Sequence, residues 1–359
     1  RAVRYGKILG IHQPFLYQLV SVVIDIMKDF YPYLMDKKAI IEKIIKTEEE
    51  NFLKTLSTGE KKLEEILSFS KNKIVSGEQA FLLYDTFGFP IELTEEISAD
   101  NGFKVDLEGF QLELAKQKER ARAARVSNQS MNNQNEEYLN FKLKSEFIGY
   151  ETLYANSQVI AIFKDGKQIE TADGMLQLVL DLTPFYAEMG GQIGDQGELT
   201  FDGMNFDVIN TVKLPNGQHL QFVDMKQTTI KVGDSVAVSV NSEFRKAICQ
   251  NHSATHLLNE ALRKVLGGHV LQQGSQVTNE NLRFDFNHYE SLTTKQILEI
   301  EKMVRDVIVK DYPVCIRETT LEEAKALGAQ ALFGEKYGNI VRLVDMQFSK
   351  ELCGGTHVK

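Results

Sequence analysis

Apolar residues recur every three or four positions through most of residues 1–145, which is the spacing of amphipathic helices. Residues 15–34 and 37–67 show this spacing most clearly, and Pro32 marks the end of the first segment. A shorter helix is predicted to begin at Thr94, where two glutamates follow a residue suited to cap a helix. The first part of the chain is therefore predicted to be an all-helical domain.

The pattern changes to short apolar or alternating segments over residues 146–241, after a polar stretch at residues 126–140. Asp-Gly and Asn-Gly pairs separate these segments, and such pairs favour the tight turns of β-hairpins. We therefore predict a small β-barrel here, with a domain boundary in the polar stretch.

Helical and strand patterns alternate in the remainder of the chain, which predicts an α+β domain. One helix is predicted over residues 254–268, opened by two histidines, and another over residues 294–310. The predicted fold class is multidomain α+β, with an all-helical domain at 1–145, a small β-barrel at 146–241 and an α+β domain at 242–359.

Composition and charge narrow the function classes. The contents of 43% hydrophobic and 25% charged residues are ordinary for soluble globular domains. No apolar run reaches the roughly 18–20 residues that cross a bilayer, so no membrane partner is expected. The net charge of -9 weakens any argument for nucleic-acid binding from bulk charge, because phosphate contacts need lysine and arginine.

The three cysteines are odd in number and widely spaced, so they predict no disulfide framework. A reducing compartment, the cytoplasm, is expected. The chain starts without methionine and without a signal-peptide hydrophobic region, and we expect it to be a piece of a longer protein.

Two histidines four residues apart, His252 and His256, are the clearest chemical signal in a chain with seven histidines. Residues i and i+4 share one face of a helix, so two imidazoles at this spacing can bind one metal ion. The alternative is a pair of ordinary helix-surface histidines, and the pair alone does not decide between them. The glutamate of the metalloprotease helix signature is missing.

Cys353 and His357 form a second pair with the same spacing, across a Gly-Gly turn whose backbone freedom lets both side chains point to one centre. Together the two pairs make a His₃Cys set, which suits tetrahedral zinc. Their wide separation in sequence fits a site between a helix and a loop rather than a compact zinc finger. We therefore predict one Zn²⁺ ion per chain at these four residues.

Three other segments suit either a binding role or a plain structural one. Residues 185–197 are rich in glycine but lack the phosphate-loop and dinucleotide spacings, which favours a simple connection between strands. Gln272 could orient a substrate carbonyl or water, and a surface turn explains it equally well. Asp85 lies among aromatic residues expected to be core, and its carboxylate could accept a hydrogen bond from a base amine.

Several segments together resemble the alanyl-tRNA synthetase family, and they occur in that family's order. The matching segments are RAVRYG, LLYDTFGFPIELT, FYAEMGGQIGDQG, HSATHLL, LRFDFNH and LCGGTH, spread over nearly the whole chain. The resemblance implies a helical tRNA-recognition region, a small barrel, and an editing domain that hydrolyses serine or glycine wrongly attached to alanine tRNA. It implies an editing fold that continues beyond Lys359. It further implies that ATP and Mg²⁺ serve an aminoacylation domain absent here, and that self-association would use regions missing from this chain.

The resemblance also implies roles for single residues. Gln272 would lie beside the scissile ester and Thr255 would help to recognise a serine hydroxyl, so both are candidate catalytic residues. Asp85 is the candidate for reading the acceptor stem, with Glu92 as an alternative, and Arg4 of RAVRYG is a second candidate tRNA-binding residue. The expected partner is alanine tRNA, and no DNA partner is expected.

Three alternatives stay open. A free-standing trans-editing protein, or the editing part of threonyl-tRNA synthetase, would share the metal pairs but not the helical segments. A tRNA-binding fragment with a structural zinc would also fit, because four protein ligands close the coordination shell. The third alternative is an unrelated zinc-stabilised interaction protein.

Overall fold

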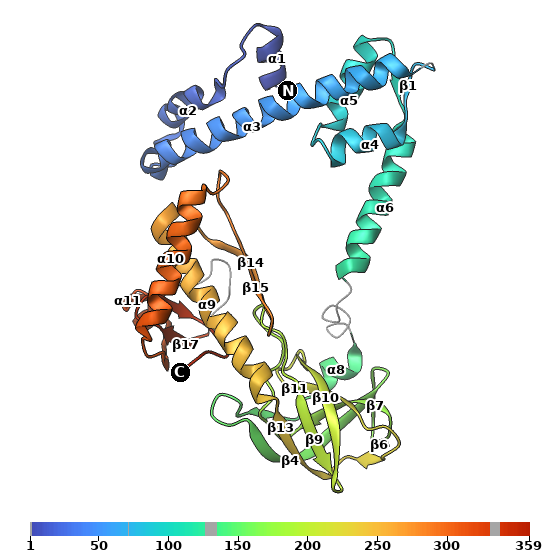
Figure 1. The fold of residues 1–359 in the computed structure, drawn as a ribbon, viewed down its shortest axis with the longest axis vertical. Helices are drawn as coiled ribbons and strands as arrows, with labels where there is room; N and C mark the ends of the chain where they lie inside the picture. Colours follow the sequence, from blue (N-terminus) through green and yellow to red (C-terminus); the bar gives the residue numbers. More distant parts are fainter. Residues whose placement is uncertain (1, 71, 126–134, 331–337) are drawn as a thin grey trace. The chain divides into compact units, whose positions relative to one another are not determined.

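The computed structural model describes residues 2–70, 72–125, 135–330 and 338–359. It divides the chain into two compact units, Arg1–Ser127 and Asn128–Lys359 (Figure 1). Residues 126–134, most of the polar stretch predicted to contain a boundary, lie outside the described residues. The domain boundaries at residues 145 and 241 stay predictions.

Helices build the first unit, as predicted. They are α1 (Ala2–Ile8), the 3-10 turn η1 (Leu16–Leu19), α2 (Val20–Met27), α3 (Tyr33–Phe69), α4 (Gly77–Asp85), α5 (Ile91–Asp100) and α6 (Leu107–Arg125). A short parallel pairing joins β1 (Ile74–Val75) to β2 (Lys104–Val105). The core of this unit consists of side chains from α3 to α6 and their connections, among them Leu56, Leu63, Leu83, Phe89, Leu93 and Phe110.

Two helix limits in this unit were predicted wrongly. Residues 15–34 are not one helix, because the turn η1 precedes α2 and α2 ends at Met27 rather than at Pro32. The helix predicted to begin at Thr94 begins at Ile91, directly after Pro90. A proline costs little at a helix start because the N–H group that it lacks would have no intrahelical partner there.

The second unit contains a six-stranded closed barrel, which confirms the predicted small barrel. Its strands are β4 (Tyr154–Lys164), β7 (Met175–Leu180), β9 (Gly197–Phe201), β10 (Met204–Lys213), β11 (His219–Asp224) and β13 (Ser235–Val240). They follow the order β13-β9-β10-β11-β7-β4, and β4 pairs again with β13 to close the barrel (Figure 1). Buried side chains alternate along β4 and β13, which is how alternating sequence fills a barrel interior.

Short elements flank the barrel. They are α8 (Glu136–Asn140), β3 (Glu146–Phe147), β5 (Lys167–Ile169), β6 (Thr171–Ala172), β8 (Leu182–Thr183) and β12 (Ile230–Lys231). β3 pairs in parallel with β8, and β12 pairs with β6. β5 extends the sheet from the edge of β4.

The barrel contains a buried histidine, His219, and we therefore expect its free energy of unfolding to depend on pH. Burial lowers the pKa of His219 to about 4, although its ring nitrogen Nδ1 lies 2.7 Å from the carbonyl oxygen of Phe185. The pKa of His219 in the folded state is below its usual value of 6.5. The contribution of its neutral ring to the free energy of unfolding is therefore complete above about pH 6.5 and is lost as the pH falls towards 4. Linkage gives a loss of about 2 kcal/mol between pH 7 and pH 5.

The measurement is urea unfolding of the wild type and of His219→Asn at both pH values. We expect the variant to lose about 2 kcal/mol less than the wild type on going from pH 7 to pH 5. An equal loss in both proteins would contradict the assignment of this histidine as a buried neutral group.

The rest of the second unit mixes helices and strands, as predicted. Its elements are α9 (Ser242–Leu266), β14 (Gln272–Val277), β15 (Leu282–Phe286), α10 (Thr294–Lys310), β16 (Cys315–Thr320), α11 (Leu321–Ala326), β17 (Ile340–Asp345) and β18 (Lys350–Leu352). β14 and β15 form a hairpin, and β16, β17 and β18 form an antiparallel sheet. Side chains of α9, α10 and β17 share a core that includes Leu257, Val307 and Val344.

Helix α9 is longer than predicted. The prediction placed its start at Ala254, whereas it begins at Ser242 and Asn241 caps it by accepting a hydrogen bond from the N–H of Phe244. The two histidines that were expected to open the helix therefore lie in its interior. Among the described residues, no helix is both long enough and apolar enough to cross a bilayer.

Candidate metal centre

Helix α9 carries His252 and His256 one turn apart on one face, with stacked rings whose centroids are 5.2 Å apart. Cys353 and His357 come from the segment after β18. Each of the four residues offers one nitrogen or sulfur atom, and these atoms all lie within 4.8 Å of one another. The Sγ atom of Cys353 is 3.4 Å from Nε2 of His252 and 3.4 Å from Nε2 of His357. The structure thus brings both sequence pairs into one group.

This group fits a tetrahedral zinc ion. Zn–S and Zn–N bonds of about 2.3 and 2.1 Å at a tetrahedral angle would separate sulfur and nitrogen by roughly 3.5 Å. The observed sulfur–nitrogen separations of 3.4 Å are close to that value. Nε2 of His256 is buried and has no hydrogen-bond partner among the residues that the structure describes, which is expected of an atom whose partner is an ion.

Each histidine of the group has a partner at its other ring nitrogen. Nδ1 of His252 is 2.7 Å from Oε1 of Gln192, and Nδ1 of His256 is 2.6 Å from Oε2 of Glu351. Nδ1 of His357 is 3.3 Å from the hydroxyl of Ser253. Donation by Nδ1–H to such partners fixes the ring orientation, so that Nε2 faces the centre.

The partner of His256 is itself held in place. Glu351 is buried, and its Oε1 accepts hydrogen bonds from Asn259 at 2.8 Å and from Ser349 at 3.2 Å. A buried carboxylate with this many donors can support a metal-binding imidazole without leaving its own charge unpaired.

The glycine-rich loop at residues 185–197 supplies Gln192, which sequence reasoning missed. Oε1 of Gln192 also accepts from the backbone N–H of Thr356 at 3.0 Å, and its Nε2 donates to the hydroxyl of Thr356 at 3.0 Å. One amide therefore connects a metal-binding candidate on α9 with the loop that carries Cys353 and His357. No local sequence pattern indicated this role of Gln192, because its partners His252 and Thr356 lie far away in sequence.

Two glycines are needed for this close approach. A Cβ atom on Gly355 would lie 2.0 Å from Cε1 of His252. Gly191 has φ +85°, and a Cβ atom there would lie 2.4 Å from the carbonyl oxygen of Ser275. A side chain at either position would push the loops away from the group.

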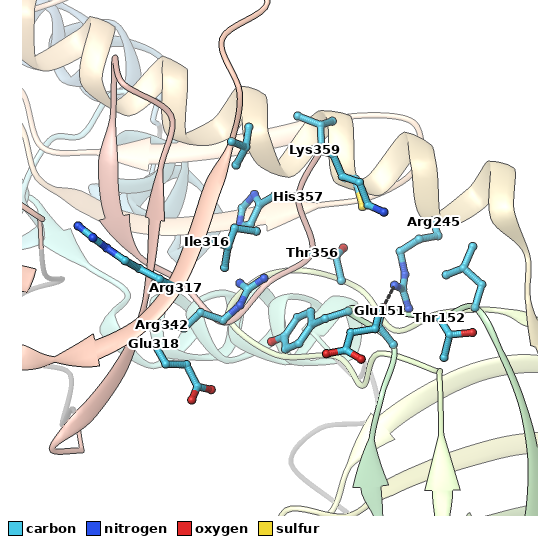
Figure 2. A pocket seen from close by; sticks show the side chains of 16 residues that line it. Glu151, Thr152, Arg245, Ile316, Arg317, Glu318, Arg342, Thr356, His357 and Lys359 are labelled. Atoms are coloured by element: carbon cyan, nitrogen blue, oxygen red, sulfur yellow. Dashed lines mark hydrogen bonds between the residues drawn. The ribbon is translucent and has the colours of Figure 1, made fainter.

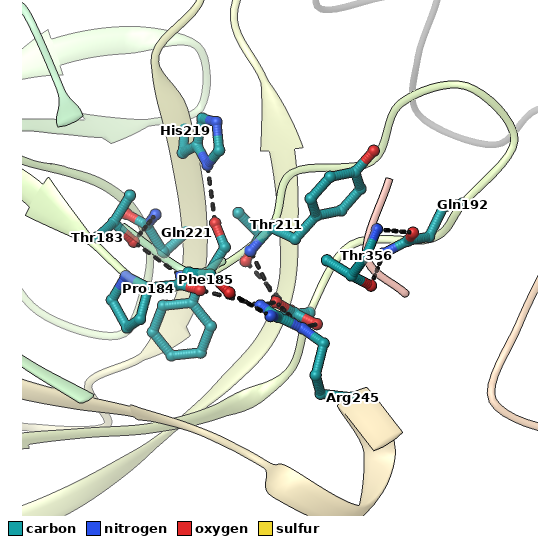
Figure 3. A network of polar contacts seen from close by, with 12 residues as sticks. Thr183, Pro184, Phe185, Gln192, Thr211, His219, Gln221, Arg245 and Thr356 are labelled. Carbon is teal, nitrogen blue, oxygen red and sulfur yellow. Dashed lines mark hydrogen bonds and ion pairs between the residues drawn. The ribbon is translucent and has the colours of Figure 1, made fainter. Parts of the chain in front are cut away.

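A buried ion pair joins the same glycine-rich loop to the start of α9 (Figure 3). Nε of Arg245 lies 2.9 and 3.0 Å from the two carboxylate oxygens of Asp195, and its Nη2 forms a further bond to that carboxylate. The guanidinium also donates to the carbonyl oxygens of Gly149 and Pro184. Asp195 accepts from the N–H of Tyr186 as well. This network ties the barrel to the helix that bears the histidine pair.

The electrostatics of the group favour ligation. Burial opposes ionisation of the Cys353 thiol, but its interactions with the surrounding imidazoles, above all that of His252, outweigh burial and hold the pKa of the thiol well below its usual value. Burial lowers the pKa of His357 to about 3, which keeps that ring neutral. Burial also acts to lower the pKa of His256, but the charge of Glu351 outweighs it and raises the pKa to about 10. A metal ion at this centre would therefore displace a proton from His256.

A cavity of about 590 Å³ lies beside the group (Figure 2). Its wall includes Thr356 and His357 from the segment after β18, and Arg245 and Cys249 from α9. Other lining residues come from residues 149–153 before β4, from β16 and β17, and from the end of the described chain. The cavity is large enough for a small ligand and directly adjoins one of the four clustered side chains.

The two candidate catalytic residues have different surroundings. Thr255 is buried on α9, and its hydroxyl donates to the carbonyl oxygen of Asn251 at 2.8 Å. Gln272 is the first residue of β14 and is partly buried, and its amide donates to the hydroxyl of Ser275 at 3.2 Å. Neither belongs to the four-residue group, and both roles stay predictions.

The two candidate tRNA-binding residues lie in the helical unit. Asp85 ends α4, is exposed and accepts a hydrogen bond from the amide of Gln117. Arg4 is buried, and its guanidinium pairs with Glu96 and Asp100. A phosphate could reach Arg4 only if these ion pairs opened. Both roles stay predictions.

Comparison with known proteins bears on the identity of the chain. The sequence profile of the tRNA synthetases class II (A) matches residues 1–244. The chain is 48% identical to an alanine–tRNA ligase of Bacillus cereus over 364 residues, covering 100% of this chain and 41% of that protein. An alanine–tRNA ligase of Geobacillus kaustophilus is 48% identical, and one of Bacillus mycoides is 47% identical, with the same shares covered.

The chain thus spans about two fifths of the length of these curated relatives, 41% of each. The match extends over the whole chain and so covers both compact units. The chain belongs to the class II (A) tRNA synthetases and is similar along its full length to alanine–tRNA ligases.

Proposed function

We propose that this chain is the part of an alanine–tRNA ligase that binds alanine tRNA and hydrolyses seryl or glycyl esters wrongly attached to it. The hydrolytic centre would be one zinc ion bound by His252, His256, Cys353 and His357. The observation that carries the proposal is this buried group, with an oriented imidazole on each histidine, beside a cavity of about 590 Å³. The parent protein would ligate alanine with ATP and Mg²⁺ at a site outside this chain, and it would work in the cytoplasm.

The need for such a centre follows from the substrates. Serine differs from alanine by one hydroxyl, and an apolar pocket rejects an added hydroxyl only weakly. A second site that binds the hydroxyl through polar groups can select the wrong ester, because alanine leaves those groups unpaired. Thr255 is our candidate for this recognition, since its hydroxyl oxygen can still accept a hydrogen bond.

The chain's own residues would orient the ester for hydrolysis. When bound, a zinc ion supplies Lewis-acid polarisation. The imidazoles, fixed by Gln192, Glu351 and Ser253, keep the geometry of the centre. Gln272 and backbone N–H groups would polarise the ester carbonyl as negative charge develops on its oxygen.

The helical unit would supply tRNA recognition. Asp85 has an exposed carboxylate that can accept a hydrogen bond from a base amine in the acceptor stem. Arg4 is a weaker candidate for direct contact, because its charge is already paired with two carboxylates.

A purely structural zinc is the second candidate function. It is favoured by one observation, the presence of four protein side chains around one centre, since closed coordination shells are typical of structural sites. In that case the chain would bind tRNA without hydrolysing its ester.

Deacylation assays separate the two proposals. The zinc-loaded chain is mixed with seryl-, glycyl- and alanyl-tRNA(Ala), and loss of each ester is followed over time. We expect the seryl ester to be lost at least about 100-fold faster than the alanyl ester, because the seryl ester has a hydroxyl that polar groups can bind and the alanyl ester has none. Equal loss of seryl and alanyl esters, or binding of tRNA with no hydrolysis, would count against an editing centre.

A further inference from the structure

The loop between Cys353 and His357 is held from outside by three hydrogen bonds to consecutive carbonyl groups. Nη1 of Arg342 donates to the carbonyl oxygen of Cys353 at 2.9 Å and to that of Gly355 at 2.8 Å. The hydroxyl of Tyr150 donates to the carbonyl oxygen between them, that of Gly354. The backbone carbonyl of Arg342 also accepts from the N–H of Cys353 at 3.1 Å.

The two donors also contact each other. The guanidinium carbon of Arg342 lies 4.0 Å from the centroid of the Tyr150 ring, within the range of a cation–π contact. The Tyr150 ring also packs edge-on against Phe147, at a centroid distance of 4.9 Å. Arg342 belongs to β17 and is labelled in Figure 2. Tyr150 belongs to the turn before β4, and both residues line the cavity. Burial raises the pKa of Tyr150, so its hydroxyl keeps the proton that it donates.

A loop with two adjacent glycines has many conformations, and only a few direct Sγ of Cys353 and Nε2 of His357 to one point. We infer that Arg342 and Tyr150 are positioning residues that set this loop conformation before a metal ion binds. The barrel then contributes to the metal centre through Tyr150, although no barrel strand carries a ligand. The inference about ligand geometry rests on the proposed metal site, whereas the inference about loop order does not.

Two conservative variants isolate the contacts. Tyr150→Phe removes one hydroxyl and keeps the ring beneath the guanidinium. Arg342→Lys keeps the positive charge, but an ammonium group cannot stack as a plane on the Tyr150 ring while it donates to two carbonyl oxygens.

Each variant has a matched control. Tyr154→Phe is the control for Tyr150→Phe, since the hydroxyl of Tyr154 contacts only the exposed side chain of Asn156 among the described hydrogen bonds. Arg283→Lys is the control for Arg342→Lys, because Arg283 forms an exposed ion pair with Asp285.

The first readout is hydrogen exchange in metal-free protein, at the amides of Thr356 and Val358. Both amides donate to buried partners, Gln192 and Ser253 respectively. We expect exchange at these amides to be about 10-fold faster in Tyr150→Phe and Arg342→Lys, and unchanged in both controls. Wild-type exchange rates in both variants would overturn the inference. If Arg342→Lys does not fold, Tyr150→Phe decides alone.

The second readout is titration with Co²⁺, whose visible spectrum reports ligand geometry. Loss of the outer contacts is expected to weaken Co²⁺ binding about 10- to 100-fold and to alter the spectrum, while both controls keep the wild-type spectrum. Wild-type affinity and spectrum in both variants would overturn the link between the Arg342 and Tyr150 contacts and the metal geometry. A wild-type chain that binds no Co²⁺ would instead refute the proposed metal site, and the exchange readout would still decide whether Arg342 and Tyr150 order the loop.

Discussion

Cys353→Ala is expected to lower zinc affinity by more than about 100-fold and to lower seryl-ester hydrolysis to a comparable extent. The thiolate is the only sulfur among the four clustered side chains, and it lies 3.4 Å from the Nε2 atoms of two histidines. Its removal would leave three imidazoles around a centre with no negative charge among them. Replacing even the outer partners of a metal ligand typically costs 10- to 100-fold, so losing a ligand should cost more.

The measurement is zinc content after dialysis against a weak chelator, together with the deacylation rate. Cys315→Ala is the matched control, because Cys315 is exposed and does not belong to the group. The control should keep one zinc ion per chain. If Cys353→Ala retained zinc and the wild-type rate, the four-residue centre would be wrong.

Arg245→Met is expected to destabilise the second unit by about 3–5 kcal/mol. The substitution leaves the carboxylate of Asp195 buried without its guanidinium partner, and Asp195 is 0% exposed. It also leaves the carbonyl groups of Gly149 and Pro184 without their donor. Burying an unpaired charge is among the costliest single changes in a folded domain.

Urea unfolding at pH 7 measures the change. Arg283→Met is the matched control, because it breaks an exposed ion pair, and a loss below about 1 kcal/mol is expected there. The double variant Asp195→Asn/Arg245→Met leaves no charge buried and should recover part of the lost stability. A loss near zero for Arg245→Met would mean that the ion pair does not hold the barrel to α9.

Patterns local in sequence predicted the fold well. The helical first part and the small barrel follow from three-and-four spacing and from Asp-Gly and Asn-Gly turns, and both are present. Helix ends were predicted less well, because a proline can either end a helix or precede one. Pro32 stands directly before α3, and Pro90 directly before α5.

The four-residue group could be found from sequence because each pair has a fixed short spacing that one helix turn or one glycine turn can satisfy. The side chains that orient the group could not be found from the sequence in this way. Gln192 reaches His252 across 60 positions, and Glu351 reaches His256 across 95. Arg342 and Tyr150 act on carbonyl groups, which every residue possesses, so no residue pattern marks their targets. Such contacts form where α9, the segments around the barrel and the sheet of β16, β17 and β18 meet, and no local sequence period indicates them.

The most direct test of the account is to titrate the metal-free chain with Zn²⁺ while following hydrolysis of seryl-tRNA(Ala). We predict that the rate rises linearly and stops rising at one equivalent of zinc per chain. Alanyl-tRNA(Ala) should be spared throughout the titration. Hydrolysis at full rate before any zinc is added, or no hydrolysis after one equivalent is bound, would contradict the claim that this metal centre is an editing site.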